Sequence, residues 1–333
     1  MNKLFSKFPI ATLAQLPTPI RPLAAIGENL FVKQDNLSGP VYGGNKIRKL
    51  EFLLGETLEQ GCKSVITYGA AGSNHALATA VCCRELGLKA ISILAPQEPS
   101  GHVRKNIIMG HAVGAELHLC PDYTVFPEVT QQISDRCLDE DGIAPYIIPA
   151  GGTNATGALG FVNAAFELAE QMQPDVIYIP MGTGGTLAGL LVGLKLAGLN
   201  TCVEAIRVVH PRFRTAIHIQ KLCNEICTKL GIDPVVKDAD IIIRDEFFGE
   251  DYGIPTPEGR EAVGLFQSKE NVHLESTYTG KCAAALLHDL RSGALDDQTL
   301  LYWNTLNSRD FSAETDPIDF HSLPPEFHHY FTT

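Results

Sequence analysis

Short apolar runs alternate with amphipathic stretches along most of this 333-residue chain. Several apolar runs are continuous, which is typical of strands that are buried on both faces of a parallel sheet. They predict strands at residues 64–68, 90–94, 116–119, 146–148, 176–179, 205–209, 241–243 and 300–303. The stretches between them predict helices at residues 47–59, 74–86, 103–109, 156–171, 187–197, 215–230, 257–267 and 280–291. This alternation indicates an open α/β architecture with mostly parallel sheets flanked by helices.

One uncharged stretch, residues 176–194, raises the question of a membrane span. It contains Pro180 and three closely spaced glycines, Gly182, Gly184 and Gly185. A lipid-exposed helix would lose backbone hydrogen bonds there, so a strand, a glycine turn and a helix are the better interpretation. The N-terminal sequence MNKLFSKFPIATLAQL also lacks the unbroken apolar run and the cleavage pattern of a signal peptide. We therefore expect no membrane partner.

Composition and charge narrow the classes of function. Apolar residues make up 45% of the chain, which is ample for a packed core. The chain has 38 acidic and 26 basic residues, a formal charge of −12, so we expect no binding to nucleic acid. Its nine cysteines lack the pattern of a disulfide framework, which indicates a cytoplasmic protein. Cys223 and Cys227 could share a helical face, but two buried thiols are favoured over a zinc site, and we expect no metal.

The segment GGNKIRK places Lys46 directly after two glycines, at the expected start of a helix. Glycines leave such a lysine uncrowded and permit a positive φ angle. An amine held there can condense with an aldehyde if its surroundings lower its pKa. An ordinary solvated lysine in a turn fits the same local pattern, so this motif alone is weak.

The segment GAAGSNH places Ser73, Asn74 and His75 between a predicted strand and a predicted helix. Ser73 is a good N-cap residue for that helix. A second interpretation has Ser73 facing a ligand, with Asn74 and the helix N-terminus supplying hydrogen bonds. The local pattern supports the two interpretations about equally.

The segment Gly182-Thr183-Gly184-Gly185-Thr186 also lies between a predicted strand and a predicted helix. Amides and hydroxyl groups in such a turn can bind a phosphate, since glycine allows its close approach. The segment has no Walker lysine and no GxGxxG spacing, so a nucleoside triphosphate or a dinucleotide is disfavoured. A plain tight turn is the alternative.

Taken together, these motifs resemble those of one family. GGNKIRK with Lys46, the triplet from Ser73, the run GGTNATGALGF at 151–161, the glycine loop 182–186 and the segment YTGK from Tyr278 occur in that family's order and spacing. From about Pro17 to Thr305 the chain is similar to pyridoxal-phosphate enzymes of the D-cysteine desulfhydrase and 1-aminocyclopropane-1-carboxylate deaminase family. The resemblance implies a tryptophan-synthase-β-like fold with two open, mostly parallel sheets, and pyridoxal 5'-phosphate as the cofactor.

The resemblance also implies which residues bind the cofactor. Lys46 would bind it covalently and later move the Cα proton of the substrate. Asn74 would hydrogen-bond the ring oxygen, and Thr305 would lie beside the pyridine nitrogen. Burial and the nearby cationic aldimine are expected to lower the pKa of Lys46 or Tyr278 toward the working pH. The phosphate would be bound by Lys49, Gly182, Thr183, Gly184, Gly185 and Thr186.

Other residues would face the substrate, which the resemblance implies is a small amino acid. Ser73 would contact its carboxylate or shuttle protons, with Asn74 and His75 beside it. Tyr278 and Tyr252 would also face the substrate. These residues, together with Lys46, complete the expected catalytic and substrate-binding set.

Two domains are expected. The larger, cofactor-binding domain would contain residues 1–49 and 158–333, and residues 50–157 would form a smaller inserted α/β domain. Insertion is favoured because no long polar linker marks a boundary. The cofactor would lie in the cleft between the domains, and the resemblance implies a homodimer.

Two positions favour the desulfhydrases within the family. Deaminases usually have a glutamine where this chain has His75, and a glutamate where it has Thr279. The predicted reaction is therefore α,β-elimination of D-cysteine, or of a similar β-substituted D-amino acid, to pyruvate, ammonia and sulfide. The chain departs from both subtypes at Ala76, where an arginine is usual, and at Leu306-Asn307, where two glycines are usual.

Three alternatives stay open. The chain could be a 1-aminocyclopropane-1-carboxylate deaminase, or a sulfo-lyase that acts on cysteate. It could also be a non-catalytic ligand sensor that retained the fold. Intact Lys46, Ser73 and Tyr278 argue against a sensor.

Overall fold

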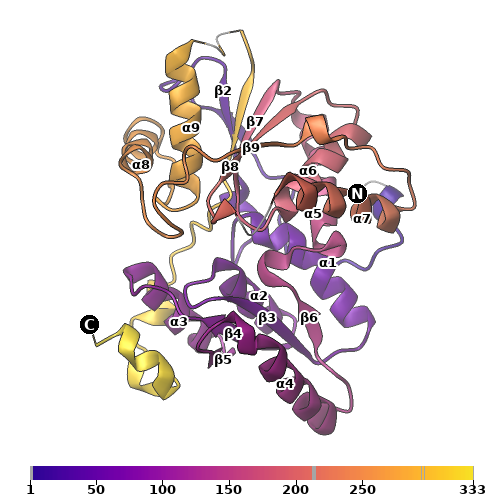
Figure 1. The fold of residues 1–333 in the computed structure, drawn as a ribbon, viewed down its shortest axis with the longest axis vertical. Helices are drawn as coiled ribbons and strands as arrows, with labels where there is room; N and C mark the ends of the chain where they lie inside the picture. Colours follow the sequence, from indigo (N-terminus) through magenta and orange to yellow (C-terminus); the bar gives the residue numbers. More distant parts are fainter. Residues whose placement is uncertain (1–2, 212–214, 294, 296, 333) are drawn as a thin grey trace. The chain divides into compact units, whose positions relative to one another are not determined.

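The computed structural model describes residues 3–211, 215–293, 295 and 297–332 (Figure 1). The chain forms two compact units. The larger unit consists of Met1–Lys7, Ala14–Lys49 and Thr153–Ser308, and the smaller unit of Phe8–Leu13, Leu50–Gly152 and Arg309–Thr333. Helix α1 (Asn45–Glu59) begins in the larger unit and ends in the smaller one. Each unit is thus assembled from separate segments of the chain.

A six-stranded sheet forms the centre of the larger unit in its described part, in the order β1-β2-β10-β7-β8-β9. β1 and β2 pair antiparallel, and the other neighbours are parallel. The strands are β1 (Ile20–Pro22), β2 (Leu30–Lys33), β7 (Val176–Met181), β8 (Cys202–Arg207), β9 (Ile242–Arg244) and β10 (Leu300–Trp303). Every residue of the central strands β7 and β10 is buried, as their continuous apolar sequences predict.

Helices cover this sheet: α5 (Ala155–Gln171), α6 (Gly185–Leu196), α7 (Ala216–Leu230), α8 (Pro257–Glu270) and α9 (Thr279–Ser292). α6 is buried along most of its length, which explains its nearly uncharged sequence. A Cβ at Gly189 would lie 2.4 Å from the carbonyl oxygen of Ala158, so glycine allows α6 to pack closely on α5. α8 and α9 lie side by side and bury Phe266 and Leu286 in one core with Tyr302 of β10 (Figure 1).

The smaller unit has a parallel four-stranded sheet in the order β5-β4-β3-β6 within its described residues. Its strands are β3 (Ser64–Ala70), β4 (Lys89–Ala95), β5 (Glu116–Leu119) and β6 (Tyr146–Ile148). Its helices are α2 (Asn74–Glu85), α3 (Gly101–Ala112), α4 (Phe126–Asp141) and α10 (Ser312–Thr315). Ile66, Ile91 and Ile93 of the sheet pack with Phe126 and Ile133 of α4 in one core.

The predicted strands and helices are all present, and the mostly parallel α/β architecture is confirmed. The strand predicted at 205–209 begins earlier, at Cys202, which pairs with Val176 of β7. Residues 176–194 form β7, a glycine turn and most of α6, as predicted. Within the described ranges, no helix combines the length and apolar character needed to cross a membrane.

Several elements were not predicted. The strands β1 and β2 were missed, and so was α4, although Phe126, Val129, Ile133 and Cys137 recur at helical spacing. Gly142 ends α4 in a left-handed conformation with φ of 73°. The unpredicted 3₁₀ turns are η1 (Lys3–Phe5), η2 (Asp35–Leu37), η3 (Tyr123–Val125), η4 (Ala150–Gly152), η6 (Asp238–Asp240), η7 (Phe320–Ser322) and η8 (Pro325–Tyr330).

The boundaries of the two units differ from the expected domains at three places. The segment Arg309–Thr333 belongs to the smaller unit, where the backbone N–H of Gln97 donates to the Tyr330 hydroxyl at 3.1 Å. The segment Phe8–Leu13 also belongs there, because the N–H of Ala11 donates to the carbonyl oxygen of Glu51 at 2.8 Å. Residues 153–157 belong to the larger unit.

All nine cysteines lie in the described part of the chain as free thiols. Cys202 is partly exposed and the others are buried. Cys223 and Cys227 are 0% and 1% exposed, so the prediction that they are buried is confirmed. Burial raises the pKa of the Cys83 thiol and, together with the nearby Cys227, that of the Cys223 thiol to about 12.

Candidate active site

Lys46 lies in the first turn of α1, after a backbone that is held tightly. Gly44 has a φ of +90°, and a Cβ there would lie 2.7 Å from the carbonyl oxygen of Thr305. The N–H of Asn45 donates to the same oxygen at 3.2 Å. Position 44 therefore requires glycine for both its dihedral angle and its close approach. The structure brings Thr305, a predicted site residue, next to the Lys46 loop.

The segment after Thr305, where the chain departs from the family it resembles, holds the same loop. The Asn307 side chain accepts a hydrogen bond from the N–H of Gly43 at 2.9 Å. The N–H of Leu306 donates to Oδ1 of Asn304 at 3.2 Å. The Asn307 side chain, which a glycine would lack, is therefore used here to fix the loop that precedes Lys46.

The Lys46 amine has the properties of a nucleophile near neutral pH. Its Nζ donates to Oδ1 of Asn45 at 2.8 Å. Burial lowers the pKa of Lys46 to about 8, because the charged form loses solvation. A substantial neutral fraction is thus present at pH 7–8, and a neutral amine can attack a carbonyl carbon.

Lys49 lies against the start of α6. A Cβ at Gly185 would lie 3.1 Å from Nζ of Lys49 and 2.9 Å from Oγ1 of Thr153. Burial, together with the charge of Lys46, lowers the pKa of Lys49 well below its usual range. A phosphate at this place would stabilise the protonated forms of Lys46 and Lys49 and would also interact with the N-terminus of α6.

Hydroxyl groups complete this end of the site. Thr153 and Thr183 bring their Oγ1 atoms within 2.5 Å of one another. The Asn45 side chain donates to Oγ1 of Thr186 at 3.1 Å. Thr153 and Asn45 were missed by the sequence analysis, although they lie within two motifs that it singled out, GGTN and GGNK.

Buried charges anchor α1 two residues beyond Lys46. Arg48 donates to Oδ1 of Asp35 at 2.7 Å and to Oε2 of Glu167 at 2.9 Å. Trp303 of β10 donates to Oδ2 of Asp35 at 2.7 Å. Removing one member would leave a buried charge without its counter-charge, so this network fixes the first turns of α1.

Tyr278 and Tyr252 form a pair, and their expected contact with the substrate stays a prediction. The Tyr278 hydroxyl donates to the Tyr252 hydroxyl at 2.7 Å. Their rings meet edge to face, with centroids 5.9 Å apart. A Cβ at Gly182 would lie 3.5 Å from the Tyr278 ring, so the pair adjoins the glycine loop.

Glu275 holds the start of α9, which carries Tyr278. One carboxylate oxygen accepts the N–H groups of Tyr278 and Thr279 at 2.7 Å each, and the other accepts that of Thr277 at 2.7 Å. The Thr279 hydroxyl accepts the Glu275 N–H at 2.8 Å and lies 3.1 Å from the Glu275 carbonyl oxygen. Both side chains are therefore used to fix the Tyr278 backbone.

Lys281 fixes the second tyrosine. This lysine is 0% exposed and donates to the carbonyl oxygens of Phe248 and Asp251. Asp251 directly precedes Tyr252, so Lys281 ties the loop of one tyrosine to the helix that follows the other. Glu275 and Lys281 could have been found only from structure, because their partners are backbone groups.

Within the smaller unit, the Ser73 hydroxyl accepts the N–H of Ala76 at 3.2 Å and caps α2. The capping interpretation is confirmed. Contact of Ser73 with a ligand stays a prediction. His75 is 3% exposed, and its expected contact with the substrate also stays a prediction.

Helix α3 holds the loop that carries Ser73 and Asn74. Asn106 donates to the carbonyl oxygen of Gly72 at 2.9 Å and to Oδ1 of Asn74 at 3.0 Å. Nε2 of His102 lies 3.0 Å from the Gly72 oxygen, and Gln97 accepts the Gly72 N–H at 3.0 Å. These three residues were not among the predicted site residues.

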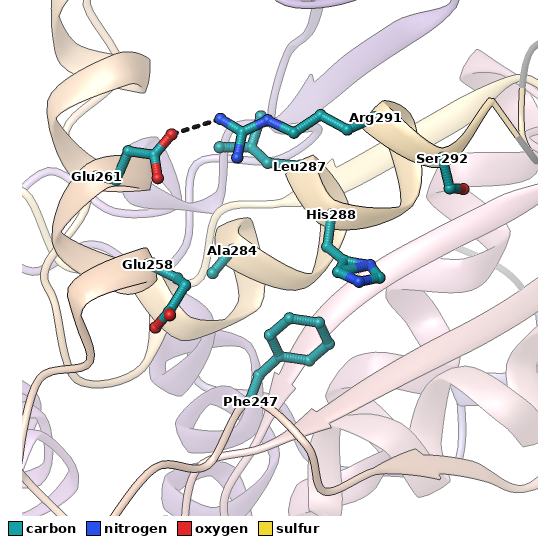
Figure 2. A pocket seen from close by; sticks show the side chains of 8 residues that line it. All are labelled: Phe247, Glu258, Glu261, Ala284, Leu287, His288, Arg291 and Ser292. Atoms are coloured by element: carbon teal, nitrogen blue, oxygen red, sulfur yellow. Dashed lines mark hydrogen bonds and ion pairs between the residues drawn. The ribbon is translucent and has the colours of Figure 1, made fainter.

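Figure 2 shows a pocket of about 340 Å³ that shares no residue with these groups. Its walls come from α8, α9 and the segment of Phe247, and Arg291 pairs with Glu261 across it at 2.5 Å. The pocket is lined by Phe247, Glu258, Glu261, Ala284, Leu287, His288, Arg291 and Ser292. It offers no amine with a lowered pKa and no glycine loop, so it does not compete as the catalytic site.

The larger unit therefore fits a cofactor that carries both an aldehyde and a phosphate. Lys46 supplies a partly neutral amine for the aldehyde. Lys49, Thr153 and the start of α6 supply a phosphate site in which a side chain at Gly185 would collide with the binding groups. Pyridoxal phosphate has both functional groups.

Comparison with known proteins agrees with this chemistry. A family described as pyridoxal-phosphate dependent enzyme matches residues 11–305. D-cysteine desulfhydrase of Yersinia enterocolitica is 33% identical over 320 residues, which cover 90% of this chain and 94% of that protein. A putative 1-aminocyclopropane-1-carboxylate deaminase of Pyrococcus horikoshii is 35% identical over 307 residues, 89% of this chain and 91% of that protein.

A solved structure gives the same result for the fold. The crystal structure of a 1-aminocyclopropane-1-carboxylate deaminase homologue matches with a TM-score of 0.81 and 32% identity, over 92% of this chain and 94% of that one. The expected pyridoxal-phosphate enzyme fold is thereby confirmed. The chain belongs to the pyridoxal-phosphate-dependent enzymes, in the family that contains D-cysteine desulfhydrases and 1-aminocyclopropane-1-carboxylate deaminases.

Proposed function

We propose that the chain catalyses α,β-elimination of D-cysteine, or of a similar β-substituted D-amino acid. With D-cysteine and water, the products are pyruvate, ammonia and hydrogen sulfide. The observation that carries this proposal is the engagement of Thr279 and Glu275 with the backbone at the start of α9. Thr279 has no carboxylate, and the Glu275 carboxylate is occupied by backbone N–H groups, so neither supplies a base beside Tyr278. Opening a cyclopropane ring needs attack or proton delivery at a carbon without a leaving group.

The residues of the larger unit have matching roles. Pyridoxal phosphate, when bound, supplies the sink for the electrons of the broken Cα–H bond. The Lys46 amine, with its pKa of about 8, takes the Cα proton. The Tyr278 hydroxyl, held by Tyr252, gives a proton to the departing sulfur. The roles of Ser73, Asn74 and His75 in binding substrate and cofactor rest on the family resemblance.

The test is a substrate panel with one preparation of the holoenzyme. D-cysteine, L-cysteine, cysteate and 1-aminocyclopropane-1-carboxylate are compared by kcat/KM, and pyruvate, sulfide, sulfite and 2-oxobutyrate are measured. We expect sulfide and pyruvate from D-cysteine at the highest kcat/KM. A higher value for the cyclopropane acid would make the chain a deaminase, and sulfite from cysteate would make it a sulfo-lyase.

The panel also tests the non-enzyme alternative. Bound cofactor with no turnover of any of these compounds would contradict the proposed elimination and favour a ligand sensor. If one of the amino acids shifts the wavelength of the cofactor's absorption band and no product forms, that amino acid is the ligand.

We also propose that the chain works as a homodimer in the cytoplasm. The dimer is supported by the family resemblance, and the reducing compartment by the nine free thiols. Light scattering of the holoenzyme should give twice the chain mass of 36.1 kDa. A mass of one chain would contradict the dimer.

A further inference from the structure

One side chain touches both ends of the larger unit's site. Asn45 donates from Nδ2 to Oγ1 of Thr186 at 3.1 Å, and accepts at Oδ1 from Nζ of Lys46 at 2.8 Å. It thus connects the glycine loop to the amine that is expected to react. We propose that Asn45 is a positioning residue, which holds the Lys46 amine with its lone pair directed away from the amide. The proposal rests on the proposed cofactor chemistry of Lys46.

The Asn45 backbone cannot easily move. Its N–H donates to the carbonyl oxygen of Thr305, and its side chain is 8% exposed. The preceding Gly44 donates its own N–H to the carbonyl oxygen of Asp35 at 2.6 Å. Asp35 in turn pairs with the buried Arg48. The amide of Asn45 is therefore carried by a rigid part of the fold.

The orientation of this amide decides what the Lys46 amine can do. An amide oxygen only accepts, so the oxygen of Asn45 takes an N–H of Lys46 and leaves the nitrogen lone pair to other partners. The reversed amide would direct an N–H donor at the same lone pair and block it. The N–H groups of Lys46 favour the observed orientation because they need an acceptor, and the Thr186 hydroxyl, which can donate or accept, then accepts from Nδ2. The lone pair is the part of the amine that attacks an aldehyde and that takes a proton.

The neutrality of Asn45 also matters. A carboxylate at the same distance would stabilise the charged lysine and reduce its nucleophilic fraction at neutral pH. Asparagine gives the same geometry without this charge. Burial can then lower the pKa of Lys46 to about 8 without opposition from position 45.

The test compares two variants of the full chain, Asn45→Asp and Asn45→Leu, after removal of the cofactor. Pulses of acetic anhydride across a pH series, read by mass spectrometry at Lys46, give the pH midpoint of its reactivity. We expect Asn45→Asp to raise this midpoint by about 1–3 pH units, since an opposite charge lies within contact distance. Lys221, which is 77% exposed on α7, serves as the internal control with an unchanged midpoint.

A second measurement follows the rate at which added pyridoxal phosphate develops its absorption band. We expect Asn45→Leu to slow this rate at least about tenfold, because a leucine neither accepts from Lys46 nor donates to Thr186. Thr183→Val is the matched control, since it removes a hydroxyl from the same loop without touching Asn45. It should weaken cofactor affinity and leave the Lys46 midpoint unchanged.

A residue with only a structural role would lower the melting temperature of both variants and leave the Lys46 midpoint where it was. An unchanged midpoint in Asn45→Asp, with wild-type uptake of the cofactor in Asn45→Leu, would overturn the proposal. The labelling needs no substrate, so failure of D-cysteine elimination would not be confused with failure of this inference.

Discussion

The loop before α1 in the larger unit and the loop before α2 in the smaller unit both place polar side chains at the start of a helix, but different forces hold them. Buried charges, Asp35, Arg48 and Glu167, fix the first loop. Hydrogen bonds of the Gln97 and Asn106 side-chain amides and of the His102 ring fix the second. Breaking a buried ion pair strongly destabilises a protein, whereas a single neutral hydrogen bond contributes only about 0.5–1.5 kcal/mol to the free energy of unfolding. The contacts that hold the Lys46 loop are therefore the more costly to break.

The largest effect is expected at Lys46 itself. Lys46→Ala should abolish covalent attachment of the cofactor and lower turnover by about 10⁴-fold, because both the nucleophile and the proton acceptor are lost. Borohydride reduction followed by peptide mass spectrometry should place the cofactor on Lys46 in the wild type. Lys49→Gln is the control, and should keep the attachment while weakening cofactor affinity. Attachment at another lysine would refute the assignment.

The next effect concerns the tyrosine pair. Tyr278→Phe should lower kcat by about 10²–10⁴ with little change in cofactor occupancy, because a proton-transfer group is lost while the ring remains. Tyr252→Phe should have a smaller effect, since Tyr252 accepts the hydrogen bond of Tyr278. Steady-state kinetics and the cofactor absorption band measure the two quantities. Equal kcat values for wild type and Tyr278→Phe would remove Tyr278 from the mechanism.

A stability experiment tests the buried charges that hold the first loop. Glu167→Gln should lower the free energy of unfolding by about 3–5 kcal/mol at pH 7, since Arg48 and Lys33 lose their shared carboxylate. Glu225→Gln is the matched control, because Glu225 is exposed and its carboxylate lies 3.9 Å from Nζ of Lys221. It should change the free energy of unfolding by less than about 0.5 kcal/mol. Urea denaturation measures both.

The Glu167 carboxylate should also make the stability of the protein depend on pH. Burial raises the pKa of Glu167, but Arg48 and Lys33 outweigh this effect and lower it to about 2. Its contribution to stability is therefore complete above the unfolded value of about 4.3 and is lost as the pH falls toward about 2. The difference between wild type and Glu167→Gln should shrink over that window. A constant difference from pH 7 to pH 3 would show that the pair is not ionised.

The smallest effect is expected in the smaller unit. Asn106→Leu should lower stability by about 1–3 kcal/mol, because the carbonyl oxygen of Gly72 and the amide of Asn74 lose a buried donor. Gln132→Leu, on the exposed side of α4, is the control and should change little. If Asn74 binds the substrate, Asn106→Leu should raise KM by a larger factor than it lowers kcat. If Asn74 binds the cofactor, the affinity for the cofactor should fall by a larger factor than kcat. Unchanged KM, cofactor affinity and kcat would show that α3 does not contribute to binding or catalysis.

Sequence predicted most of the fold, because parallel strands and their helices leave strong patterns of apolar residues. Its motifs also singled out Lys46, Lys49 and the glycine loop, and the structure places Lys49 against Gly185 of that loop. It did not predict the approach of Thr153 to Gly185 or of Asn307 to Gly43, since these contacts join segments that are far apart in the chain. The Glu275 cap was missed for another reason, because a carboxylate that binds backbone N–H groups has no partner that a sequence can reveal.

The buried cysteines have a practical consequence for any assay of this chain. Thiols whose pKa is raised to about 12, such as those of Cys83 and Cys223, stay protonated at neutral pH and react slowly with electrophiles. Reagents that capture sulfide also attack exposed thiolates, and a protein with such groups would consume the reagent and lose activity during the measurement. This chain keeps eight of its nine thiols inside the fold. The folded protein should therefore add little background when sulfide is captured, whereas the thiol of D-cysteine reacts with the same reagents and has to be subtracted with an enzyme-free blank.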